Sequence, residues 1–270
     1  MFIVDFHAHA FPDALAERAM PALEAEGDIV AALDGKVSSL LRSMDAAGIR
    51  ASVVASIATR PSQFEPILRW SAEIASERII PFPSVHPDDP QLAAHVHEIR
   101  AAGFKGLKLH PYYQDFDLDE ARLRPLFAAA QECSLLVLCH TGFDLAFARV
   151  RRADPVRVLR LLDAFADLRF VASHLGGWQD WDEVERHLAG RPILMDLSFA
   201  IADIGPARAR ALILRHPPEC MLFGTDSPWA GQQETIDQVR RLDLGPERER
   251  LLFGDNAARL LEIPAGSTAG

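Results

Sequence analysis

The stretch VDFHAH, residues 4–9, has the pattern of a short buried strand that ends in a His-x-His pair. Side chains alternate along a strand and two residues rise only about 6.6 Å, so His7 and His9 point to one face and lie close together. Both imidazoles can therefore bind one metal ion, whose nitrogen ligands stand about 2.0–2.1 Å away. A zinc ion usually takes four ligands, so the others must come from elsewhere in the chain.

Short apolar runs alternate with segments of helical periodicity along the rest of the chain. The runs expected as strands are residues 2–7, 51–57, 79–85, 104–110, 135–140, 168–174, 193–197 and 220–225. Each is followed by an expected helix, the first a short one at residues 13–20. This alternation predicts an α/β fold, a single (β/α)8 TIM barrel over residues 1–264 with a flexible tail at 265–270. An open doubly wound sheet would instead have a glycine-rich turn after its first strand.

The composition argues against several classes of function. The chain has 270 residues, 49% of them hydrophobic and 24% charged, and a formal net charge of −10. An acidic chain without a basic patch is not expected to bind nucleic acid. Cys133, Cys139 and Cys220 lack paired spacing and are expected to be buried thiols rather than disulfides. The absence of a signal sequence and of long apolar runs predicts a cytoplasmic protein with no membrane partner.

Polar residues recur where the predicted strands end, and in a TIM barrel that rim carries the active site. The rim residues are His7, His9, Lys108, His110, His140, His174 and Asp226. Five of the ten histidines share this rim, which chance placement explains poorly. Asp5 is predicted to share the inward face of His7, and it has two equal interpretations. It either orients a ligand histidine or forms hydrogen bonds lower in the barrel.

Six motifs in chain order carry a resemblance to a known family. They are DFHAH at 5–9, GLKLHP at 106–111, HTG at 140–142, HLGG at 174–177, GTDSPW at 224–229 and FGDNA at 253–257. With these motifs the chain resembles the amidohydrolase superfamily, and specifically the branch related to aminocarboxymuconate-semialdehyde decarboxylase. The motifs span nearly the whole chain, and they specify the superfamily and branch much better than the reaction.

The resemblance implies a metal centre and roles for the rim residues. His7, His9, His140 and Asp226 match the ligands of a divalent metal, for which Zn²⁺ suits the mix of nitrogen and oxygen, with Mn²⁺ or Fe²⁺ left open. In the same family pattern, Asp226 also takes up a proton from metal-bound water. His174 matches a general acid/base that holds the water or the substrate.

Lys108 leaves the number of metal ions open. In binuclear members of the superfamily a carboxylated lysine on the fourth strand bridges two ions, and the run from Gly106 to His110 resembles that segment of urease. The branch that the chain resembles is generally mononuclear. We therefore favour one ion, with Lys108 buried and paired and with His110 at the substrate, where it can polarise a carbonyl.

Two reactions fit the same ligands. Metal-dependent hydrolysis of an amide, ester or lactone is the first choice, because the chain is short for the decarboxylases. The alternative is non-oxidative decarboxylation of a planar unsaturated or aromatic acid, for which Arg60 would clamp the carboxylate and Trp229 would wall the pocket. A scaffold protein ranks lower, because every ligand motif is intact. The expected partner is a small-molecule substrate, and a homodimer is left open.

Overall fold

The computed structural model describes residues 1–264, and the tail predicted at 265–270 lies outside the described residues. The strands are β1 (Val4–Ala8), β2 (Ala51–Ala55), β3 (Ile79–Phe82), β4 (Gly106–Leu109), β5 (Leu136–Cys139), β6 (Arg169–Ala172), β7 (Leu194–Asp196) and β8 (Met221–Leu222). All of them pair in parallel and in chain order, as β1-β2-β3 and as β4-β5-β6-β7-β8.

Backbone hydrogen bonds join the two sheets at both seams. Between β3 and β4, the Lys108 amide donates to the Pro83 carbonyl at 2.8 Å. Between β8 and β1, the Phe6 amide donates to the Phe223 carbonyl at 2.8 Å, and the Asp226 amide donates to the His7 carbonyl at 2.7 Å. The sheet therefore closes on itself, which confirms the predicted TIM barrel.

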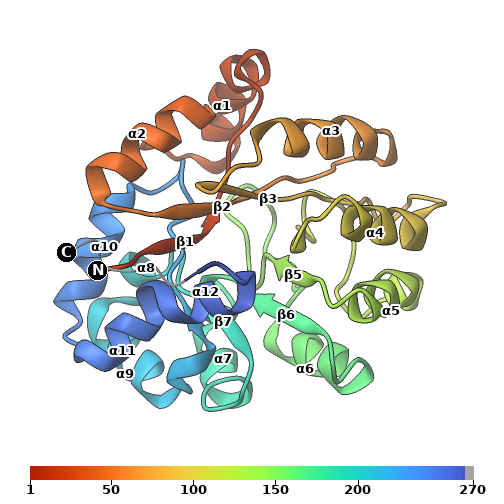
Figure 1. Cartoon of the computed structure of the whole chain (residues 1–270). Coiled ribbons are helices and arrows are strands. Elements are labelled where there is room, and N and C mark those ends of the chain that lie inside the picture. The colour runs from red at the N-terminus through yellow and green to blue at the C-terminus, as the bar shows by residue number, and fades with distance from the viewer. Residues whose placement is uncertain (265–270) are drawn as a thin grey trace.

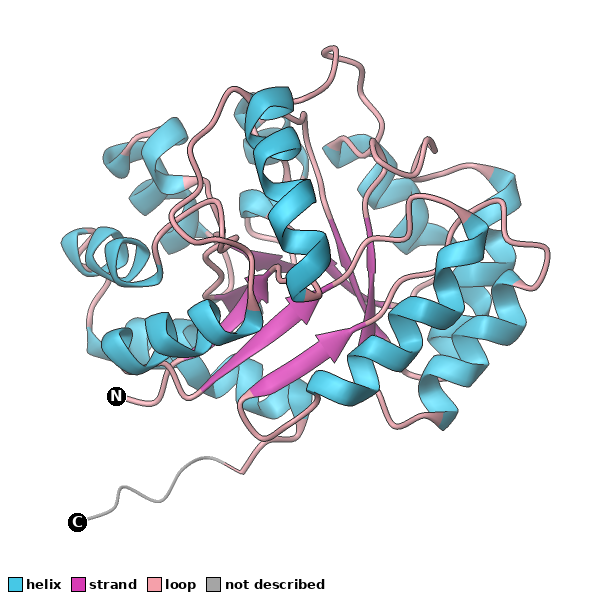
Figure 2. Cartoon of the chain, turned by 90° about the horizontal axis from the view of Figure 1, so that it is seen from above, coloured by secondary structure: helices cyan, strands magenta, loops and turns pink. Residues whose placement is uncertain are grey.

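Helices surround the strands in a ring (Figures 1 and 2). They are α1 (Asp13–Gly27), α2 (Val37–Ala47), α3 (Phe64–Ile74), α4 (Leu92–Ala101), α5 (Arg124–Glu132), α6 (Pro155–Ala164), α7 (Trp181–His187), α8 (Ile201–Ile204), α9 (Pro206–Arg215), α10 (Gln232–Arg241), α11 (Pro246–Arg250) and α12 (Asn256–Leu261). The first helix is longer than predicted and continues through Pro21. A proline costs a helix one hydrogen bond and bends it, but does not always end it.

The apolar core has two parts. A larger cluster packs the helices onto the outer face of the strands. A smaller cluster brings together side chains from many strands, among them Phe6, Phe82 and Leu138. Ala257 and Leu261 of α12 complete this second cluster, so the last helix covers side chains of the barrel itself. The polar rim described below therefore rests on an apolar base.

Gly142 fixes the turn that follows β5. Its φ is 88°, and a Cβ built on it would stand 2.0 Å from the backbone nitrogen of Trp178. We expect Gly142→Ala to lower the free energy of unfolding by about 3 kcal/mol or more, because both the left-handed backbone and the clash resist a side chain. Urea unfolding measures the loss.

Gly103 provides the matched control for this clash. Its φ is 89°, but a Cβ there would meet nothing within 4 Å. Gly103→Ala should therefore cost only about 1–2 kcal/mol, the price of the left-handed backbone alone. Equal losses in the two variants would contradict the proposed contact between Gly142 and the Trp178 backbone.

Candidate active site

His7 near the end of β1 and His9 just after it both have their Nδ1 atoms occupied by the protein. His9 Nδ1 lies 2.7 Å from the Ala55 carbonyl, which can only accept, so this nitrogen carries the proton. His7 Nδ1 faces Asp196 Oδ2 at 3.1 Å and Ser198 Oγ at 2.9 Å. Ser198 Oγ in turn donates to Asp196 Oδ1, so His7 Nδ1 is also the donor. Both Nε2 atoms therefore carry the ring's lone pair, which in His7 also lies 2.8 Å from Lys108 Nζ, so a cation bound there would replace this contact.

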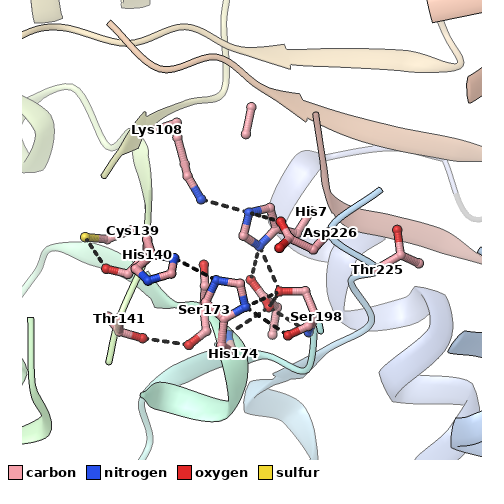
Figure 3. A network of polar contacts seen from close by, with 12 residues as sticks. His7, Lys108, Cys139, His140, Thr141, Ser173, His174, Ser198, Thr225 and Asp226 are labelled. Atoms are coloured by element: carbon pink, nitrogen blue, oxygen red, sulfur yellow. Dashed lines mark hydrogen bonds and ion pairs between the residues drawn. The ribbon is translucent and has the colours of Figure 1, made fainter. Parts of the chain in front are cut away.

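His140 and His174 show the same arrangement. His140 Nε2 donates to the Phe143 carbonyl at 2.8 Å, and His174 Nδ1 donates to the Ser198 carbonyl at 2.9 Å. Their remaining nitrogens, His140 Nδ1 and His174 Nε2, face each other at 3.0 Å (Figure 3). Two lone pairs at this distance repel unless a proton or a cation lies beside them.

Asp226 supplies the negative charge of the cluster. Its Oδ1 lies 3.3 Å from His7 Nε2 and 3.2 Å from His9 Nε2. Burial raises the pKa of the Asp226 carboxyl, but the surrounding His7, His9 and His174 hold it well below its usual range. Burial also lowers the pKa of His7 to about 4, so its imidazole is neutral near pH 7, as a metal ligand must be.

Backbone strain accompanies this geometry. His174 and Asp226 have positive φ values of 57° and 65°, which non-glycine residues adopt rarely. Such strained residues cluster at functional sites, where the surrounding structure holds them in place. His174 follows β6 by two residues and Asp226 follows β8 by four, and both side chains face His7.

The donor set fits a divalent cation. His7, His9 and Asp226 present ligand atoms that all lie within 4.8 Å of one another. Inward-facing nitrogen lone pairs and one carboxylate oxygen match the preferences of Zn²⁺ and of other first-row divalent ions. His140, the fourth ligand expected from the resemblance, lies farther round the rim, beside His174 with ring centroids 4.6 Å apart.

Lys108 lies at this cluster and is fully buried. Its Nζ is 2.8 Å from His7 Nε2, and no carboxylate of the described residues lies within ion-pair distance of it. Burial lowers the pKa of its ammonium group, although Asp226 and Asp196 oppose the shift. The side chain is thus buried as expected, and its partner is an imidazole.

His110 has a partner that the sequence analysis missed. The Tyr113 amide donates to His110 Nδ1 at 3.5 Å, so the proton of the neutral ring is on Nε2, which faces Asp144 Oδ2 at 3.4 Å. Burial lowers the pKa of His110 to about 4. Asp144 follows the HTG motif by two residues. An acidic residue this close in sequence to a rim histidine is the feature from which its role could have been predicted.

Asp196 and Ser198 are also functional positions that the sequence analysis missed. Asp196 is fully buried at the end of β7, where it accepts from His7 Nδ1 and from the amides of His174 and Ser198. Asp196 is the single acidic residue of an otherwise apolar predicted strand, and this feature could have indicated its role from the sequence. Asp5, in contrast, accepts from Thr225 and from Gln232 of α10, and contacts no histidine ring. Of its two interpretations, the structure matches the one with hydrogen bonds away from the ligands.

Asp5 faces away from His7, and the physical cause lies in the pairing of β1 itself. The pairing of β1 with β2 changes register between Asp5 and Ala8. Simple alternation, which placed Asp5 and His7 on one inward face, is therefore wrong across this irregularity. Asp5 instead ties β1 to the segment that leads from β8 to α10, and so fixes the position of Asp226 indirectly.

A cavity of about 510 Å³ opens onto the cluster. Its polar lining comes from the strand ends, and its apolar lining from α1, α3 and the loops after the strands. Trp229 lines this cavity, as do Trp178 and Phe199. Arg60 is exposed and is not among the lining residues, so the structure does not bring it to the site.

These features define the class of protein: a TIM barrel with a histidine–carboxylate cluster at the carboxyl ends of its strands, below a substrate-sized cavity. The Amidohydrolase family model matches residues 4–263, and the chain belongs to that family. It is therefore an amidohydrolase-family enzyme, of a family that depends on divalent metals.

Several solved structures share the fold along nearly the full chain. 5-Carboxyvanillate decarboxylase LigW from Sphingomonas paucimobilis has a TM-score of 0.72 at 15% identity, covering 97% of this chain and 99% of its own. The related enzyme of Novosphingobium aromaticivorans, complexed with manganese, has a TM-score of 0.71 at 16% identity and covers 97% and 96%. A protein of Pseudomonas putida provisionally assigned as a 2-pyrone-4,6-dicarboxylic acid hydrolase has a TM-score of 0.69 at 20% sequence identity. The match covers 98% of this chain and 99% of that protein.

At these identities the similarity concerns the fold, and the metal of the manganese complex does not identify the metal here. A comparison of the sequence with curated proteins found no match. Among the described residues, no helix combines the length and the apolar character that crossing a membrane requires.

Proposed function

We propose that the protein is a metal-dependent, non-oxidative decarboxylase of a planar unsaturated or aromatic carboxylic acid. The observation that carries this proposal is the cavity, which joins the histidines and carboxylates of the rim to a large, mostly apolar lining. Beyond the cluster the lining has few hydrogen-bond partners, so it suits a flat apolar ring better than a polar amide. The resemblance to 5-carboxyvanillate decarboxylases supports the same choice over the hydrolysis preferred from the sequence.

The state of His110 adds a second argument. A histidine that polarises a carbonyl during hydrolysis must direct an N–H group at the substrate oxygen. Here Asp144 Oδ2 lies 3.4 Å from the His110 Nε2 that carries the proton, so it competes with a substrate oxygen for that N–H group. We assign Asp144 a positioning role, in which it fixes the tautomer and the plane of the His110 ring beside the substrate.

His7, His9 and Asp226 would hold the metal ion, with His140 as a further ligand. Bound there, a divalent cation supplies positive charge that orients the acid and offsets negative charge as the reaction proceeds. Zn²⁺ and Mn²⁺ both suit this donor set.

We assign to His174 the transfer of the proton that replaces the carboxylate on the substrate. His174 Nδ1 stays bonded to the Ser198 carbonyl, so its Nε2 is the atom that exchanges a proton with the substrate. Burial lowers the pKa of His174 to about 4, so the neutral ring holds only its Nδ1 proton and Nε2 must first take up a proton from solvent. This proton is then added to the carbon that bears the carboxylate. The bond between this carbon and the carboxylate then breaks, its electron pair returns to the unsaturated system, and neutral CO₂ leaves.

Lys108 leads us to propose a single ion per chain. Its Nζ lies 2.8 Å from His7 Nε2, a contact in which an unmodified lysine donates to the ring, and this supports a single ion over a carboxylated bridge. Elemental analysis after metal loading should give about one equivalent, and ¹³C-bicarbonate should produce no carbamate signal in NMR spectra. Lys105→Ala, at a partly exposed lysine that pairs with Glu262, serves as a control. Two equivalents, with one lost in Lys108→Ala, would contradict the single-ion centre.

The reaction is tested with a substrate panel. Aromatic and unsaturated acids are assayed for CO₂ release, and small lactones, esters and amides for acid release, each with metal-loaded and metal-stripped protein. We expect CO₂ release from an aromatic acid that depends on metal, and no hydrolysis. Hydrolysis of a lactone, ester or amide without any CO₂ release would overturn the proposal.

A further inference from the structure

The cavity is much larger than a single aromatic ring requires. A cavity of roughly 150 Å³ suffices to bind benzene, whereas the cavity here has a volume of about 510 Å³. A ring with its carboxylate at the metal cluster therefore fills only part of this space. The remainder must be occupied by another part of the substrate or by water.

Apolar side chains line the remainder. Leu15, Ala19, Ala22 and Leu23 of α1 occupy positions i, i+4, i+7 and i+8, so they form one stripe of the helix. Ile67 and Trp70 of α3, together with Ile29, Leu145 and Ala146, extend this lining, and Ser56, Thr59, Gln63 and Tyr113 are the uncharged polar side chains of the cavity. We call the apolar lining the apolar channel. A water molecule in such surroundings is poorly stabilised, because it would find few groups with which to form hydrogen bonds.

Charge is confined to the other end. Apart from the histidines, the charged side chains among the described lining residues are Lys108, Asp144 and Asp226, and all three lie at the histidine cluster. A second charged group on the substrate would therefore be buried in the channel without a partner, which is strongly unfavourable. The part of the substrate that enters the channel must be uncharged.

The channel also reaches the surface. Leu15 and Leu145 both line the cavity and keep 41% and 48% of their surface exposed. The Cβ position of Gly27, at the end of α1, lies 3.9 Å from Leu145 Cβ, so α1 and the loop after β5 meet beside this opening. An apolar group longer than the channel can extend between them into solvent.

We propose that the substrate is an acid whose reacting ring bears an extended, uncharged apolar group, and that Ala19 and Ala22 set the space for this group. This inference rests on the proposed function only for the part of the substrate that reacts, which is the ring with its carboxylate at the histidine cluster. The apolar channel selects by the size of the second group, and short side chains on α1 are what leave it open.

Binding of alkyl-substituted 2-hydroxybenzoates, with chains from methyl to hexyl, tests the channel by isothermal titration calorimetry on the metal-loaded protein. Each added methylene should lower Kd by up to about fourfold, which corresponds to about 0.8 kcal/mol per buried CH₂. Ala19→Phe should abolish this dependence on chain length and leave the binding of unsubstituted 2-hydroxybenzoate unchanged.

Two further variants make the result decisive. Ala22→Phe changes an exposed residue of the same stripe, so it tests the channel even if Ala19→Phe fails to fold. Ala25→Phe places the same ring on an exposed position of α1 that does not line the cavity, and should behave as wild type. A Kd that does not depend on chain length in the wild type would overturn the inference. Dependence on chain length without any CO₂ release would support the channel and overturn the proposed reaction.

Discussion

Replacing His7 and His9 together by alanine is expected to abolish stoichiometric metal binding and with it all turnover. Both Nε2 lone pairs converge on Asp226, and their Nδ1 protons are already committed to Asp196, Ser198 and Ala55. Their removal leaves one carboxylate of the compact ligand group. Elemental analysis after metal loading and dialysis should fall from about one equivalent to background.

The control for this experiment uses two histidines outside the cavity. His97 on α4 and His187 on α7 are partly exposed, and each lies near a glutamate on the surface. Their double alanine variant should keep its metal. If the His7/His9 variant also retained its metal, the ion would have to bind elsewhere, and the ligand assignment would fail.

Replacing His174 by alanine should separate catalysis from metal binding. Its Nδ1 is fixed by the Ser198 carbonyl, so only Nε2 can exchange a proton with the substrate. We expect kcat for CO₂ release to fall by about 10²–10⁴-fold, the usual contribution of a general acid/base. Metal content should stay near one equivalent, which elemental analysis of the same sample measures.

His95 provides a matched control, since it bonds Asp89 and stacks on Phe64 away from the cavity. His95→Ala should keep kcat close to that of wild type. Loss of metal from His174→Ala would contradict the assignment, because it would make His174 a ligand rather than the residue that exchanges the proton.

Much of this site could be predicted from the sequence because it depends on local patterns. Apolar runs mark parallel strands, and polar residues at their ends mark the rim, which is how His7, His9, His140, His174 and Asp226 were found. The structure confirms the barrel and brings these residues together at its carboxyl end.

The remaining features depend on contacts between distant segments. Asp196 meets His7 across 189 residues of sequence, and Asp144 meets His110 through a loop, so neither pair has a local signature. The register change in β1 turned Asp5 away from His7, which alternation cannot anticipate. Arg60 follows β2 as expected, but its chain segment carries the guanidinium outside the cavity lining. The volume of the cavity depends on how α1 packs, and the sequence analysis ended that helix too early.

The central claim is that the histidine cluster supports loss of CO₂ from an aromatic acid held in the apolar cavity. The most direct measurement follows 2-hydroxybenzoate and its hexyl derivative, each labelled with ¹³C in the carboxyl group, by NMR in deuterated buffer. With metal-loaded protein, the account predicts that the label appears as ¹³CO₂ and bicarbonate, and that one deuterium is found on the carbon that carried it. Metal-stripped protein should give neither. Label that stays on the ring for both acids, while the same preparation hydrolyses a lactone or an ester, would contradict the account.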